Sequence, residues 1–129
     1  MSFVKFLPAW LHAVADYAVG GLLIIVALAA GGSDKATAVG VVVGAVVLAV
    51  SLMTKYPLGL VKVLPFTIHS AGDYLAAALL VISPFALGFT DSDGGLSAFY
   101  IVAGLAVLAV SLITNYQYSP KRNPVPATA

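Results

Sequence analysis

Residues 7–17 read LPAWLHAVADY, and residues 64–74 read LPFTIHSAGDY, so one pattern occurs twice, 57 positions apart. Both copies contain Leu-Pro, then a histidine, then Asp-Tyr at identical spacing, and these two histidines are the only ones in the chain. A second pattern closes each copy, since residues 48–56 read LAVSLMTKY and residues 108–116 read LAVSLITNY. The chain is therefore an internal duplication.

The composition places this duplication in a membrane. Of the 129 residues, 61% are hydrophobic and 9% are charged, whereas a soluble domain carries about 25% charged residues. Four apolar stretches are each close to the ~20 residues that a helix needs to cross ~30 Å of hydrocarbon. Inside lipid the backbone must satisfy its own hydrogen bonds, which favours helices over any open structure. The expected spans are residues 8–30, 36–55, 66–89 and 96–115.

We predict an all-α fold, a four-transmembrane-helix bundle built from two tandem helical hairpins. Repeat 1 covers about residues 7–56 and repeat 2 about residues 64–116, within a single integral membrane domain over residues 1–129. Each repeat has two spans, so both copies enter the membrane from the same side, and we expect a pseudo-two-fold axis along the membrane normal. Residues 119–129 contain prolines and no apolar run, which indicates a flexible tail.

Basic residues indicate the orientation. One side of the expected membrane carries Lys5, Lys55, Lys62, Lys121 and Arg122. The opposite loops carry Lys35 together with Asp34, Asp91 and Asp93. The positive-inside rule then predicts a multi-pass protein of the cell inner (plasma) membrane with both termini in the cytoplasm. The net charge of +1 gives no electrostatic case for nucleic-acid binding, and the absence of cysteine excludes disulfides and thiolate metal sites.

The repeated histidine and aspartate are the candidate site residues. His12 and Asp16 are four residues apart, as are His69 and Asp73, which places each pair on one face of a helix. With a rise of 1.5 Å per residue, Asp16 would lie roughly 12 Å inside the helix start, in the inner leaflet, and the parallel repeat places Asp73 at the same depth. An exposed Asp at mid-membrane costs about 2.5–3.5 kcal/mol on insertion scales. The cost at this shallower depth is lower but still unfavourable, so both should face the bundle interior or water. If the spans 8–30 and 66–89 face each other across the axis, the four side chains form one polar cluster inside the membrane.

Three interpretations of this polar cluster stay open. It fixes helix register by hydrogen bonding, because polar side chains connect helices in membranes. Alternatively it is a proton or ion relay in a coupled transporter. The third interpretation is a ligand site, in which the histidines bind haem b or join the carboxylates around a divalent metal.

The first interpretation leads to a non-enzymatic structural or accessory membrane protein, for which we expect no cofactor. Its partners would be the lipid bilayer and either a second copy of the chain or a larger membrane complex.

A resemblance supports the duplicated hairpins. Residues 82–89 read ISPFALGF, about ten residues after Asp73-Tyr74. This pattern resembles the SPW-repeat family of small membrane proteins, in which each repeat is a pair of transmembrane helices with Ser-Pro-Trp in the first. Here Phe85 follows Ser83-Pro84 in place of Trp, and repeat 1 has Val26-Ala27 where repeat 2 has Ser-Pro. The resemblance implies a fold and no biochemical activity.

Proline and glycine predict two local features. Pro84 removes a backbone donor, so we expect the third span to kink or end near Ile82, with Ser83 bonding a freed backbone group. Phe85 and Phe89 would then be anchors at the membrane interface. Small residues allow close helix approach in membranes. Those assigned to helix packing are Gly40, Gly44 and Gly104.

Overall fold

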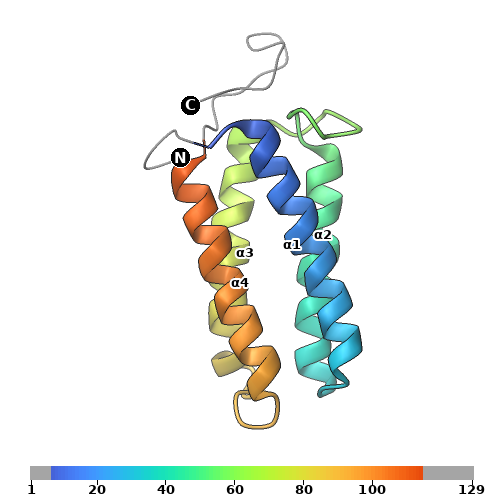
Figure 1. The fold of residues 1–129 in the computed structure, drawn as a ribbon, viewed down its shortest axis with the longest axis vertical. Helices are drawn as coiled ribbons and strands as arrows, with labels where there is room; N and C mark the ends of the chain where they lie inside the picture. The colour runs from blue at the N-terminus through green and yellow to red at the C-terminus, as the bar shows by residue number, and fades with distance from the viewer. Residues whose placement is uncertain (1–6, 115–129) are drawn as a thin grey trace.

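The computed structural model describes residues 7–114, which form four α-helices arranged as two antiparallel hairpins (Figure 1). All four helices are long and apolar enough to cross a membrane. The predicted all-α, four-helix architecture of paired hairpins is therefore confirmed. The tail predicted at residues 119–129 lies outside the described residues. The helices are α1 (Ala9–Ala30), α2 (Asp34–Met53), α3 (Phe66–Ala86) and α4 (Gly94–Ile113).

The helix ends follow from local chemistry, part of which the duplication repeats. Helices α1 and α3 both begin directly after a proline, Pro8 or Pro65, whose missing N–H is not needed at a helix start. Ser33 caps α2, and its Oγ accepts a hydrogen bond from the Ala36 N–H. Helix α1 ends at Gly31, whose positive φ of 62° suits glycine.

Of the two outcomes expected at Pro84, a kink or an end of the helix near Ile82, the second does not occur, because α3 continues to Ala86. Proline removes only one hydrogen bond from the ladder, and packing against neighbouring helices sustains such a helix in a membrane. Within residues 7–114 the Ser83 hydroxyl makes no hydrogen bond, so the expected bond to a freed backbone group is absent.

The two phenylalanines near this proline have opposite environments. Phe85 is 65% exposed on the outer surface of the bundle, as an anchor requires. Phe89 is buried, so its predicted role as an interface anchor is wrong. Its ring packs edge-on against Tyr100 with centroids 6.2 Å apart. The turn after α3 folds this side chain back over the bundle, because the Phe89 N–H bonds the Pro84 carbonyl (3.0 Å).

Close packing within each hairpin depends on glycines. A Cβ atom at Gly44 would lie 2.7 Å from the carbonyl oxygen of Gly20 on α1, and one at Gly104 would lie 2.8 Å from that of Ala77 on α3. Gly40 leaves room for the Tyr100 hydroxyl. All three predicted packing glycines therefore lie at close contacts between helices, and Gly44 and Gly104 make equivalent contacts in the two repeats.

Helices within a hairpin pack closely along their length, whereas α1 and α3 of the two hairpins do not. Among the described residues, no Cα atom of α1 lies within 8 Å of one in α3. Each hairpin instead begins by bonding the end of the other. The Leu7 N–H donates to the Ile113 carbonyl (2.6 Å), and the Leu64 N–H donates to the Met53 carbonyl (2.8 Å). These equivalent bonds bring both hairpin entrances to the same end of the bundle (Figure 1).

We predict that Gly44→Ala and Gly104→Ala destabilise the bundle. The added methyl would meet a backbone oxygen that cannot rotate away, and overpacking of this kind costs about 1–3 kcal/mol. Gly21→Ala is the matched control, because nothing lies within 4 Å of its added Cβ. Thermal unfolding in detergent micelles, followed by circular dichroism, measures the effect. Equal melting temperatures for Gly44→Ala and Gly21→Ala would contradict the packing assignment.

Candidate functional site: a histidine and aspartate cluster

The four candidate residues converge at the end of the bundle where both hairpins begin. His12 and Asp16 come from α1, and His69 and Asp73 from α3; together we call them the His/Asp cluster. His12 Nε2 lies 3.2 Å from Asp16 Oδ1 and 3.0 Å from Asp73 Oδ2. His69 Nε2 lies 3.0 Å from Asp16 Oδ2 and 3.0 Å from Asp73 Oδ1. Each imidazole thus contacts both carboxylates, and all four residues are buried.

Two threonines hold the opposite nitrogens of the imidazoles. His12 Nδ1 lies 2.7 Å from Thr114 Oγ1, and His69 Nδ1 lies 2.6 Å from Thr54 Oγ1. Each threonine hydroxyl donates its own hydrogen to the carbonyl four residues earlier in its helix. The oxygen therefore accepts from the imidazole, so Nδ1 carries a hydrogen and Nε2 faces the carboxylates. Each bond also crosses between repeats, because each histidine opens one repeat and its threonine closes the other.

Aromatic side chains cover the cluster. Tyr56 OH donates to Asp16 Oδ2 at 3.1 Å. Burial, together with the charge of Asp16, raises the pKa of Tyr56 above its ordinary value, so the hydroxyl remains a donor. The Phe66 ring packs edge-on to His12 and His69, with centroids 5.4 Å and 5.8 Å apart. The cluster is thereby separated from water at this end of the bundle.

The sequence did not reveal the roles of the threonines and the tyrosine that contact the His/Asp cluster. Thr54, Tyr56 and Thr114 belong to the closing pattern of the repeats, and that repetition was the available signal. What the sequence did not show is that a closing threonine bonds the histidine of the other repeat, because this pairing depends on how the hairpins dock.

A second polar contact, also missed, joins the hairpins at the opposite end of the bundle. Asp93 Oδ1 accepts from the Ser33 N–H (2.8 Å), and its Oδ2 accepts from the Ser33 hydroxyl (2.6 Å). We call Ser33 and Asp93 the tip pair. They are equivalent positions, 60 residues apart, and each precedes the first residue of a helix. Hydrogen bonds from Ser33 and then Ser92 lower the pKa of Asp93 below its ordinary value.

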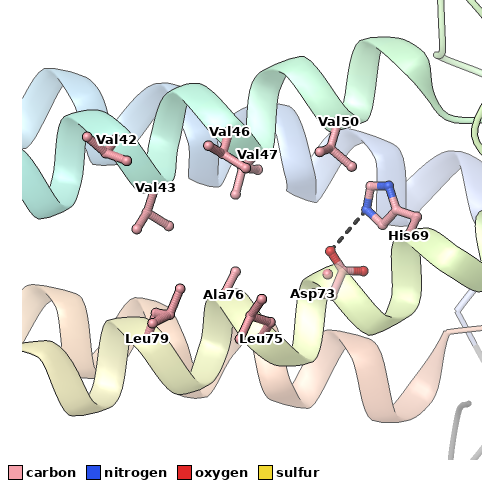
Figure 2. Close-up of a pocket in the computed structure, with 11 residues that line it drawn as sticks. Val42, Val43, Val46, Val47, Val50, His69, Asp73, Leu75, Ala76 and Leu79 are labelled. Atoms are coloured by element: carbon pink, nitrogen blue, oxygen red, sulfur yellow. Dashed lines mark ion pairs between the residues drawn. The ribbon is translucent and has the colours of Figure 1, made fainter.

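Two lateral pockets reach the His/Asp cluster. The pocket between α2 and α3 has a volume of about 180 Å³, and His69 and Asp73 lie at one end of it (Figure 2). Its equivalent between α1 and α4 reaches His12 and Asp16 and has a volume of about 40 Å³. The larger pocket is lined by Gly72 and Ala76 where the smaller has Ala15 and Val19. Smaller side chains therefore leave more room beside α3.

The cluster suits some ligands better than others. One donor atom from each of the four residues lies within 4.8 Å of the other three, a separation that allows them to surround a metal ion. A haem iron bound by both histidines would need its porphyrin plane between the two rings. Carboxylate oxygens already lie 3.0 Å from each Nε2 and occupy that space. The geometry thus favours a compact cation over haem b.

Known proteins offer no direct comparison for this arrangement. A scan against protein-family models and searches of curated proteins and of solved structures found no match. The resemblance to the SPW-repeat family therefore stays a prediction, and function has to be argued from the geometry of the site.

We predict that the tip pair makes stability pH-dependent in acid. A carboxylate whose pKa is lower in the folded protein stabilises it above the ordinary pKa of about 3.9, and this contribution disappears as pH falls through the folded value. Asp93→Asn should therefore lower the melting temperature at pH 6, and the difference from the parent should shrink below about pH 4.

Asp91→Asn is the control for this pH series, because Asp91 is exposed and its substitution makes the same change in charge. It should match the parent at each pH. A constant difference between Asp93→Asn and the parent from pH 6 to pH 3 would contradict the assigned role of the carboxylate.

Proposed function

We propose that this chain is a small, non-enzymatic membrane protein of the SPW-repeat type, in which the His/Asp cluster clamps two duplicated hairpins into one unit. The observation that carries the proposal is the contact across hairpins. His12 bonds Asp73, and His69 bonds Asp16, although the backbones of α1 and α3 stay apart. Side chains of the cluster thus replace the close backbone packing seen within each hairpin.

The energetics of charge in lipid explain why such a clamp is effective. A separate hairpin would leave its aspartate with one histidine, whereas docking provides a second. Removing one partner of a buried ion pair costs about 3–5 kcal/mol, because the remaining charge stays buried. Any slip of one hairpin against the other breaks the cluster, so the cluster selects one register rather than merely adding attraction.

The surroundings of the cluster favour a clamp over a proton or ion relay. Its polar atoms point toward one another and toward the threonines. From His69 and Asp73 the α2/α3 pocket continues along valine and leucine side chains, which cannot carry protons (Figure 2). Large apolar side chains on the outer surface, among them Ile25 and Val102, suit contact with lipid. An accessory role, as a homo-oligomer or within a larger membrane complex, would use this surface.

A double-mutant cycle tests the clamp. His12→Gln, Asp73→Asn and the double variant should show a coupling energy of about 0.5–3 kcal/mol, because the two side chains touch. Reversible unfolding of the full chain in micelles, in buffer that contains a chelator, provides the free energies. His12→Gln combined with Asp93→Asn is the control pair, and distance should make its effects additive. Additive effects at His12 and Asp73 would overturn the clamp.

The proposal includes an orientation, with both termini in the cytoplasm of a cell that carries the protein in its inner membrane. Lys55 and Lys62 support it, because they lie in the connection between α2 and α3, at the same end as the cluster. A reporter fused after Ala129 should be active in its cytoplasmic form. The same reporter placed at Gly32, between α1 and α2, should report the opposite side. Activity of the Ala129 fusion outside the cytoplasm would refute this orientation.

A further inference from the structure

We propose that the His/Asp cluster binds one divalent first-row transition-metal ion, with Zn²⁺ as the reference. The ligands are Nε2 of His12, Nε2 of His69 and one carboxylate oxygen each from Asp16 and Asp73. This inference builds on the proposed clamp, because the ion would hold the four side chains of the cluster together. The two ideas are separable, because the clamp needs only contact between the side chains, whereas the metal site needs a bound ion.

The distances among the donor atoms support this site. A tetrahedral zinc ion with bonds of about 2.0–2.2 Å holds neighbouring ligand atoms about 3.3 Å apart. Each of the four carboxylate oxygens lies 3.0 to 3.2 Å from one of the two Nε2 atoms. Whichever oxygen of an aspartate binds the ion, its distance to one histidine nitrogen is therefore already close to this value. All donor atoms lie within 4.8 Å of one another. The longest separation therefore has to close by at most about 1.5 Å, shared among the torsions of four side chains.

The hydrogen-bond arrangement supports the same site. Each Nδ1–H is committed to a threonine oxygen, so a neutral imidazole presents the lone pair of Nε2 to two carboxylates. Lone pairs that face one another repel unless a cation lies between them. If the two Nε2 atoms are protonated instead, they supply only two N–H donors for the four close contacts with carboxylate oxygens. One dication interacts with all four side chains and neutralises both carboxylates.

The residues that hydrogen-bond to the cluster are arranged as metal-binding histidines require. A ligating histidine donates its other N–H to a neighbouring oxygen, which fixes the ring orientation. Thr54 and Thr114 supply those oxygens, and the Tyr56 hydroxyl orients Asp16. Imidazole and carboxylate donors without sulfur favour Zn²⁺ and similar divalent ions over copper(I).

Metal analysis of the full-length protein tests this proposal. The protein is purified in detergent through a tag without histidines, stripped with a chelator, exposed to Zn²⁺ and freed of unbound metal. Elemental analysis should give one zinc per chain for the parent. Substitution with Co²⁺ should give the visible absorption bands of a tetrahedral nitrogen and oxygen site.

Matched variants assign the ion to the cluster. His69→Gln and Asp16→Asn should abolish stoichiometric binding, while Asp93→Asn, at the other end of the bundle, should keep one ion per chain. Thr54→Val removes the oxygen that orients His69 and should weaken binding 10- to 100-fold. Thr54→Ser keeps that oxygen and should bind within a few-fold of the parent.

Two further measurements keep the test decisive if a ligand variant fails to fold. Zn²⁺ should raise the melting temperature of the parent, because an ion that binds only the folded state stabilises it. The rise should be smaller in Thr54→Val than in Thr54→Ser. A parent that binds no zinc, or zinc binding unchanged in both His69→Gln and Asp16→Asn, would overturn the metal site. Coupling between His12 and Asp73 in chelator would still support the clamp.

Discussion

Two carboxylates buried inside a membrane bundle must be neutralised, and in this protein the histidines that do so are shared between the two hairpins. Asp16 and Asp73 each contact a histidine of their own helix and a histidine of the other hairpin. The register of the hairpins, the docking of each closing threonine on the opposite histidine and the cover provided by Tyr56 all depend on this contact. Loss of one partner would leave an uncompensated charge in an apolar environment, which costs about 3–5 kcal/mol.

Duplication explains the symmetry of the bundle, and divergence of the copies explains its asymmetry. Equivalent residues near a two-fold axis face each other, so two identical acceptors there would repel. At the tip, one copy has Ser33 and the other Asp93, which creates a donor and an acceptor. The equivalent positions 40 and 100 have also diverged. Gly40 leaves room for Tyr100, whose hydroxyl donates to the Ala36 carbonyl. The His/Asp cluster avoids repulsion between identical groups because each copy supplies both a histidine and an aspartate.

Much of the fold was predictable, because the physical signals are local or repeated. Apolar runs of about twenty residues predict spanning helices, and a repeat with two spans predicts parallel copies. His12 and Asp16 recur as His69 and Asp73, so their equal depth follows from the duplication. The continuation of α3 through Pro84 and the burial of Phe89 were not predictable, since neighbouring helices decide both.

The sequence by itself determined the helices, their pairing into hairpins and the depth of the polar groups, because these depend on hydrophobicity, chain connectivity and repetition. Only the tertiary structure decided which groups touch. It showed that Nε2 of each histidine faces two carboxylates while Nδ1 is held by a threonine of the other repeat. A hydrogen bond or a metal bond depends on distances of a few tenths of an ångström and on the direction of a lone pair. Those quantities exist only once two hairpins, separate in the sequence, are docked in one register.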